Sequence, residues 1–159
     1  MMTKEGIYVP SILEDLETTF KKYCSNKAFL DLGSGNGKVL GLAFKHNSII
    51  RGAEIDKEFY DNAEFRRWTD NKDLFEMDFE IYNILYYFMK GCNQEDRLIE
   101  KLNKEGQEIL ILYTNGSNDN EIEYFTNKLN AKRIDSFRNV LIYRFKTQYI
   151  NENTDKWSI

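Results

Sequence analysis

Three glycines at every second position constrain this chain more than any other feature of its sequence. Gly33, Gly35 and Gly37 follow a short apolar run at residues 29–32 and precede a helical pattern that begins at Lys38. An apolar run of this length that ends at glycines is typical of a buried strand. Glycine has no Cβ, so the backbone can turn sharply and a ligand can lie directly against it. The stretch therefore predicts a strand, a ligand-binding loop and a helix.

The spacing of these glycines narrows the kind of ligand. G-x-G-x-G differs from the dinucleotide fingerprint G-x-G-x-x-G, because the third glycine falls one residue early. A phosphate loop of the form G-x-x-x-x-G-K-[ST] is not present in the chain. The alternative is a glycine-rich turn that binds nothing.

Length and composition limit the class of protein. The 159 residues favour one domain, residues 1–159, with an entry segment and helix at 1–27, an α/β core at 28–146 and a polar tail at 147–159. The net charge of −4 argues against general binding of nucleic acid. Two cysteines and one histidine make a metal site improbable, and reduced thiols fit a cytoplasmic protein. No apolar run reaches membrane-spanning length, and nothing here indicates an oligomeric state.

Helical and strand patterns alternate along the chain. The S-x-x-E pattern of Ser11 and Glu14 predicts a capping box that starts a helix running to about Cys24. Further helices are expected at 38–46, 57–68, 94–103 and from 119 to about 129, and strands at 28–32, 49–55, within 69–78, at 81–89, 108–113, 133–137 and 140–145. This alternation predicts an α/β fold with a mainly parallel, seven-stranded sheet. The short turn at Arg138 and Asn139 makes the last two strands an antiparallel C-terminal hairpin.

Acidic residues follow the first strands, at the sheet edge where such folds bind ligands. Glu54 follows the second strand and can accept hydrogen bonds from two ribose hydroxyls, although a cap or a solvated charge is the alternative. We expect Glu54 to be partly exposed, so that its loss weakens ligand binding and hardly changes stability. Asp56 suits the N-cap of the next helix better. Asp73 and Leu74 belong to the expected third strand, where the acid could bind an adenine amino group or lie in an exposed loop.

Tyrosines are the candidates for the opposite wall of the pocket. Tyr86 and Tyr87 lie near the end of the dense aromatic strand 81–89, and Tyr8 lies in the entry segment before Pro10. An aromatic run is more often core than site, so Tyr86 and Tyr87 have that alternative. A helix-terminal histidine is more often a favourable dipole contact than a catalytic base, which leaves His46 outside the predicted site.

Taken together, the segments DLGSGNGK, RGAEID, DLF and YNILYYF resemble, in order and spacing, the class I methyltransferases that use S-adenosylmethionine. With YVPS at Tyr8, the chain looks like the small protein-lysine methyltransferases related to the ATP-synthase c-subunit enzyme. The resemblance implies a Rossmann-like methyltransferase fold. It also implies that S-adenosylmethionine is held by Asp31, Gly33, Ser34, Gly35, Gly37, Glu54, Asp73 and Leu74.

The chain also departs from that pattern. Asn36 stands where the subfamily usually has an acid, the subfamily's membrane segment is lacking, and no N-P-P-Y or D-P-P-Y follows the fourth strand. The last point disfavours the usual base and glutamine amino methyltransferases. We therefore expect a methyltransferase with a methyl acceptor that is a protein lysine, with no metal and with nucleic acid disfavoured. The alternatives are a non-catalytic relative that binds the cofactor or a partner, and a small-molecule or RNA methyltransferase, since Lys132, Arg133, Arg138, Arg144 and Lys146 cluster late in the chain.

Overall fold

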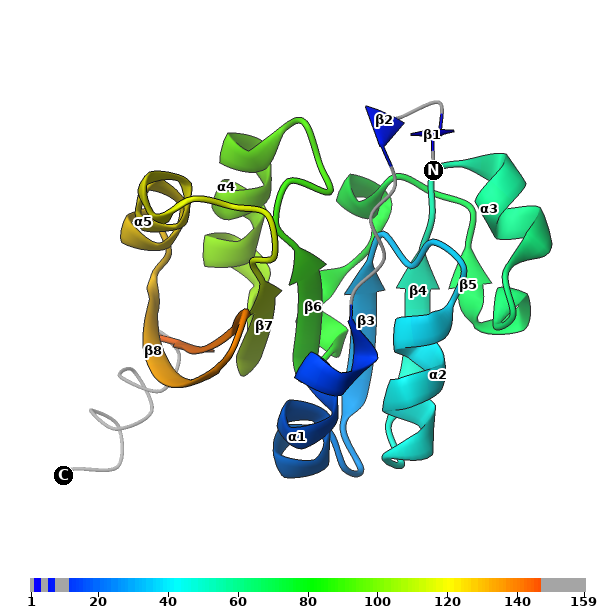
Figure 1. Ribbon diagram of the computed structural model, residues 1–159, viewed down its shortest axis with the longest axis horizontal. Coiled ribbons are helices and arrows are strands. Elements are labelled where there is room, and N and C mark those ends of the chain that lie inside the picture. Colours follow the sequence, from blue (N-terminus) through cyan, green and yellow to red (C-terminus); the bar gives the residue numbers. More distant parts are fainter. Residues whose placement is uncertain (1, 4–5, 8–11, 147–159) are drawn as a thin grey trace, which may run out of the picture.

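A seven-stranded sheet forms the centre of the molecule. The computed structural model describes residues 2–3, 6–7 and 12–146. The strands are β3 (Ala28–Leu32), β4 (Ile49–Ala53), β5 (Thr69–Asp70), β6 (Ile84–Phe88), β7 (Ile109–Tyr113), β8 (Ala131–Phe137) and β9 (Val140–Phe145), in the order β5-β4-β3-β6-β7-β9-β8. The first five are parallel, whereas β9 is antiparallel to both of its neighbours. The predicted α/β class, the parallel sheet and the C-terminal hairpin are confirmed (Figure 1).

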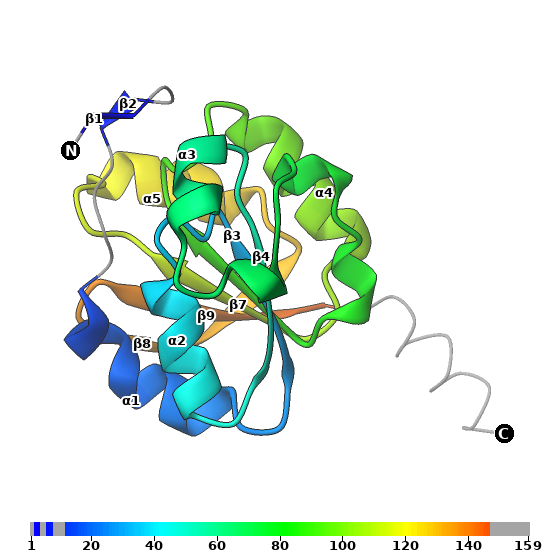
Figure 2. The same cartoon turned by 90° about the vertical axis from the view of Figure 1, so that its right-hand side faces the viewer.

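Helices cover both faces of this sheet. On one face, α1 (Leu13–Tyr23) and α2 (Lys38–Lys45) pack against β3 and its neighbours. On the other face lie α4 (Glu95–Glu105) and α5 (Asp119–Asn127). Figure 2 shows α2 and α4 on opposite sides of the strands. Because both faces are covered, the central strands are almost wholly buried, as their continuous apolar sequences predict.

The alternation of side chains along β3 divides the core into two halves. Leu30 and Leu32 belong to the half under α4 and α5, and Phe29 belongs to the half under α1 and α2. There Phe29 stacks on Tyr86 and meets Phe20 of α1 edge-on, with ring centroids 6.3 and 5.2 Å apart. Asp31 is the exception, since a carboxyl group occupies a buried position at the end of this strand.

The strand order determines where a ligand can bind. The chain runs from β3 outward to β4 and β5, and then crosses back to place β6 on the other side of β3. In open parallel sheets, ligands bind in the crevice outside the carboxyl ends of the strands, where the order reverses. Here that point lies between β3 and β6. A small antiparallel pair, β1 (Met2–Thr3) and β2 (Gly6–Ile7), lies at the same end of the molecule (Figure 1).

The third helix is shorter than the predicted range 57–68, so that prediction is wrong in its length. The helix α3 spans only Lys57–Asn62, and a separate 3₁₀ turn, η1, spans Arg66–Trp68. The chain leaves the helix at Ala63, which has an extended backbone, and this brings the Phe65 ring over Gly41 of α2. A Cβ on Gly41 would lie 2.8 Å from that ring, so the glycine makes room for it. A tertiary contact thus overrides the local helical pattern.

Three other expectations also need correction. The residues Asp73 and Leu74 do not form a strand, because β5 ends before them and Leu74 begins a 3₁₀ turn, η2 (Leu74–Glu76). The aromatic strand β6 starts only at Ile84, after a further 3₁₀ turn, η3 (Phe79–Ile81). Helix α1 has Ile12 as its N-cap, without a side-chain hydrogen bond. The predicted cap Ser11, Tyr8 and the tail at 147–159 lie outside the described residues.

Candidate cofactor site

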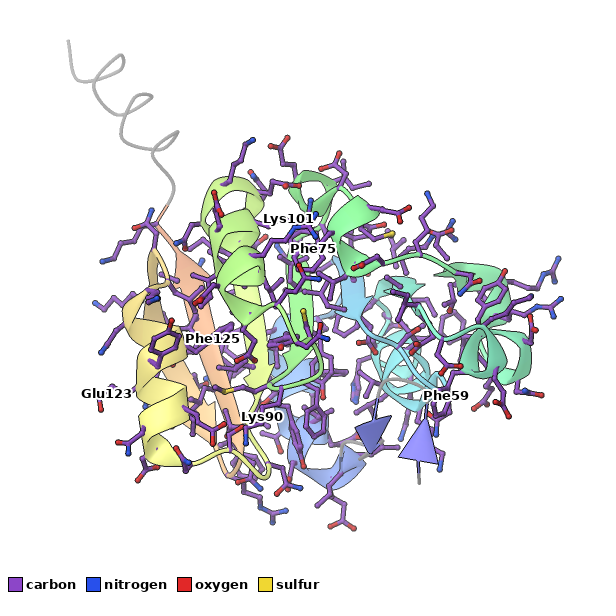
Figure 3. The ribbon with its side chains drawn as sticks, turned by 90° about the horizontal axis from the view of Figure 1, so that it is seen from above. Phe59, Phe75, Lys90, Lys101, Glu123 and Phe125 are labelled. Carbon is purple, nitrogen blue, oxygen red and sulfur yellow. The ribbon has the colours of Figure 1, made fainter. Side chains whose placement is uncertain are left out.

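A cavity of about 520 Å³ opens at the carboxyl ends of β3, β4 and β6. Its wall contains six predicted cofactor residues: Asp31, Gly33, Ser34, Glu54, Asp73 and Leu74. Figure 3 looks down on this edge and labels Phe59, Phe75 and Lys90, which line the cavity from three different segments. Gly35 and Gly37 belong to the same loop but are not part of the wall.

Hydrogen bonds to the end of β4 hold the glycine loop in place. The carbonyl oxygen of Ala53 accepts the N–H groups of Gly33 and Ser34, both at 2.9 Å. Gly33, Gly35 and Gly37 all have positive φ, which explains the three glycines, since other residues rarely adopt that backbone. A Cβ on Gly33 would meet no atom within 4 Å, so the loop presents open space to the cavity at this residue.

Glu54 braces this loop from beneath. Its Oε1 accepts the Gly35 N–H at 2.7 Å, and its Oε2 accepts the Asp56 N–H at 2.9 Å. The side chain is only 8% exposed, so the expectation of a partly exposed acid is wrong. Both oxygens of Glu54 thus accept from backbone N–H groups at the rim of the cavity. Asp56, as predicted, caps α3 by accepting from the N–H groups of Glu58 and Phe59.

Two buried polar atoms in the cavity wall have no partner. They are Oδ1 of Asp31 and Oγ of Ser34, in side chains that are 2% and 5% exposed. Native proteins pair almost all buried polar groups, so each unpaired atom needs an explanation. Burial, and secondly the nearby Glu54 carboxylate, raise the pKa of Asp31 well above its ordinary value. The carboxyl group of Asp31 is therefore set up to meet a hydrogen-bond donor, and a cation above all.

Asp73 and its neighbours form the wall on the β5 side. Asp73 caps η2, because its Oδ1 accepts the Phe75 N–H at 3.2 Å. The half-buried Phe75 ring lines the cavity. The guanidinium of Arg97, on α4, lies 4.1 Å from the centroid of this ring. Phe59 of α3 contributes a second ring to the wall. Flat apolar surfaces near an acid suit a nucleobase with an exocyclic amino group.

The other half of the cavity follows β6. Tyr86 lines it, and so do Phe88, Lys90 and Asn115. Lys90 has a positive φ of 70°, and its ammonium group pairs with Glu121 of α5 at 2.7 Å. This half is where an acceptor could approach.

The structure does not bring Tyr87 to the cavity. Its side chain faces the α4 and α5 half of the core, where the ring stacks on Phe125 at 5.8 Å. Its hydroxyl donates to Glu95 at 2.7 Å. Because successive strand residues point to opposite faces, Tyr86 and Tyr87 could not both face one pocket.

Sequence reasoning did not single out Phe59 or Asn115 for the site; it included Phe75 only in the DLF motif, and Phe88 and Lys90 only in the strand end 86–90 that was expected to open towards the methyl group. Phe88, Lys90 and Asn115 end or directly follow β6 and β7, and their place after parallel strands was a usable signal. Phe59 and Phe75 come from short turns of helix and had no such signal. His46 lies away from this wall, with Nε2 2.9 Å from Oε1 of Glu17 on α1.

Two further searches covered only the described part of the chain. Within it, no three His, Cys, Asp or Glu side chains come together in a way that could hold a metal ion. Among the same residues, none of the helices has the length and apolar character needed to cross a membrane.

Comparisons with known proteins agree on the architecture. No protein-family model and no curated protein sequence matches the chain. Solved structures do: an RNA methyltransferase from Salinibacter ruber with S-adenosyl-L-homocysteine has a TM-score of 0.58 and 16% identity, over 87% of this chain and 92% of that one. The magnesium protoporphyrin IX methyltransferase of Synechocystis PCC 6803, with bound S-adenosylmethionine, has a TM-score of 0.62 and 11% identity, over 88% and 86%. The chain thus has the Rossmann-like fold of class I methyltransferases.

The bracing role of Glu54 generates a first prediction. Glu54→Ala should lower the free energy of unfolding of the ligand-free protein by about 2–3 kcal/mol, because the N–H groups of Gly35 and Asp56 lose a charged acceptor. Urea denaturation measures this. Glu64→Ala, an exposed glutamate in the following loop, should change stability by no more than about 0.5 kcal/mol. Equal stability of Glu54→Ala and wild type would contradict the bracing role.

Buried Asp31 generates a second prediction, on pH. Its pKa is raised in the folded state, so between the unfolded pKa, near 4, and the folded pKa the folded protein binds more protons. Wild-type stability should therefore fall with rising pH relative to Asp31→Asn, by up to about 1.4 kcal/mol per pH unit. Denaturation from pH 4 to 8 tests this, with the exposed Asp61→Asn as a flat control. The prediction is contradicted if the difference in unfolding free energy between wild type and Asp31→Asn stays constant over this range, or if it changes in favour of wild type as the pH rises.

Proposed function

We propose that the protein is an S-adenosylmethionine-dependent methyltransferase. The observation that carries this proposal is the buried, unpartnered carboxyl oxygen of Asp31, a residue that lines the cavity at the carboxyl edge of the sheet. The amino-acid end of S-adenosylmethionine offers an ammonium group for the carboxyl of Asp31. Gly33 adds open space for close approach of the ligand.

The loop supports this cofactor over a dinucleotide or a nucleotide phosphate. A phosphate site needs free backbone N–H groups, whereas those of Gly33, Ser34 and Gly35 already donate to Ala53 and Glu54. The carboxylate of Glu54 would also repel the phosphate, and a neutral Asp31 carboxyl would give it no countercharge. A ligand that is cationic near the loop fits both facts.

Each wall of the cavity would have its own task in binding. Glu54 lines the cavity where its carboxylate would meet ribose hydroxyls, and Asp73 with Leu74 and Phe75 suits the adenine. S-adenosylmethionine supplies a methyl group on a sulfonium, which an acceptor takes by in-line displacement. The residues around Tyr86 and Phe88 would align the acceptor and exclude water, which accounts for much of the rate in such a transfer.

For the acceptor we propose a protein lysine. The support is the likeness of YVPS, DLGSG and DLF to the small protein-lysine methyltransferases, with Tyr8 as an acceptor-side residue that stays a prediction. A specific observation keeps RNA as the second candidate: one structural neighbour is an RNA methyltransferase, and 92% of its chain is covered. A relative that binds the cofactor without turnover is the third.

One experiment separates these three candidates. The protein is incubated with S-adenosylmethionine labelled in its methyl group and with a cell extract, and the labelled fraction is then digested by protease or by nuclease. Label that hydrolyses to methyllysine supports the proposal, and label released by nuclease transfers it to RNA. Cofactor binding without any transfer of label identifies the non-catalytic relative. No binding of the cofactor in calorimetry overturns the proposed function itself.

The open space at Gly33 generates a matched pair of variants. Gly33→Ala should weaken binding of S-adenosylhomocysteine at least about tenfold, because its methyl group enters the cavity against the ligand. Gly116→Ala lies in the acceptor half, also at positive φ and with nothing near its Cβ, so both carry a similar backbone strain of about 1–3 kcal/mol. Gly116→Ala should therefore keep cofactor affinity. Calorimetric titration measures the affinity of both variants. Equal affinities would show that Gly33 does not face the ligand.

A further inference from the structure

Two acidic side chains that line the cavity, Asp31 and Glu54, interact electrostatically and differ in their hydrogen bonds. Glu54 accepts a backbone N–H on each of its two oxygens, so its surroundings favour the charged form. Asp31 has an oxygen without any partner and is almost fully buried. When two carboxyl groups share a site, one of them keeps a proton. The hydrogen bonds decide which one, and it is Asp31.

We propose that the free protein holds a proton on Asp31, and that the ammonium group of the ligand takes the place of that proton. The step is balanced: the protonated carboxyl of Asp31 loses H⁺ to solvent, and the resulting carboxylate pairs with the incoming ammonium group. No other bond forms or breaks. This inference rests on the proposed function and adds to it a rule for which ligands the cavity accepts.

The charged groups around the cavity allow this exchange. Acidic Asp56 and Asp73 and basic Lys38, Lys72 and Lys90 also line the wall, on the segments that surround β3. None of them changes the pKa of Asp31, which is raised by its burial and by Glu54. Within the described residues no salt bridge includes Asp31, so no protein cation already occupies the position offered to the ligand.

This arrangement makes Asp31 a specificity-determining residue. A nucleoside that carries an ammonium group gains a charge-assisted bond when the proton leaves. A nucleoside without that group meets a neutral carboxyl and gains no such bond. A nucleotide phosphate meets the charge of Glu54 and gains nothing from proton loss. The site would thus select amino-acid-bearing nucleosides by charge exchange, beyond the shape of the cavity.

The test is calorimetric titration of the wild-type protein with S-adenosylhomocysteine. Titrations in two buffers of different ionisation enthalpy, at pH 6–7.5, count the protons released. The ligand's α-amino group titrates at about pH 8 or above, so its own contribution to the proton count is smallest at pH 6. We expect net proton release on binding, up to one proton per ligand bound. The association constant should rise with pH, by at most about tenfold per pH unit, which is the slope for one proton.

Three controls make the result specific. 5′-Methylthioadenosine, which keeps the nucleoside and lacks the amino acid, should bind without proton release. Asp31→Asn should bind S-adenosylhomocysteine more weakly, without release and with an affinity independent of pH. Asp73→Asn, an equal change elsewhere in the same wall, should weaken binding and still release the proton.

The outcomes separate this inference from the proposed function. Binding of S-adenosylhomocysteine with no proton released overturns the exchange and leaves the cofactor assignment standing. Proton release that persists in Asp31→Asn moves the titrating group elsewhere and also overturns it. If Asp31→Asn does not fold, proton release by the wild-type protein is compared between S-adenosylhomocysteine and 5′-methylthioadenosine. Equal release with both ligands overturns the exchange. Absence of binding at every pH overturns both the exchange and the proposed function.

Discussion

The hydrogen bonds between the glycine loop and the end of β4 are the contacts on which the rest of the site depends. One carbonyl oxygen, that of Ala53, accepts from both Gly33 and Ser34, and the next residue supplies a carboxylate to Gly35. These bonds hold the loop in its left-handed backbone and direct α2 along the sheet. They also place the acid that would bind the ribose within the support of the loop. A change at Glu54 therefore affects the shape of the cavity and its chemistry together.

Local patterns were sufficient to predict most of the sheet. The strand at 28–32 follows from its short apolar run, and the antiparallel pair around Arg138 and Asn139 follows from the length of the turn. The predictions that failed depend on contacts between distant segments. Helix α3 stops early because Phe65 packs on Gly41, and no local signal in 57–68 contains that contact.

The candidate site, too, could be predicted from the sequence only in part. Topology alone brings residues that follow parallel strands to one edge, so Asp31, Glu54 and Asp73 could be grouped from the sequence. Their environments could not be derived from it. That Glu54 is buried and doubly bonded, and that Asp31 has an unpaired oxygen, depends on how the loop folds back onto β4. Tyr87 shows the opposite case, because strand alternation already required it to face away from Tyr86.

The edge strand β5 affects where the protein unfolds locally. β5 contributes only two residue pairs to the sheet, and α3 beside it has no buried residue. Segments with few buried contacts open at low free energy, independently of the global fold. Amide hydrogens of α3 should consequently exchange with solvent through local opening, while those of β3 and β6 exchange only with global unfolding. Since Phe59 belongs to α3, one ring of the wall that would face the adenine lies in a segment with few buried contacts.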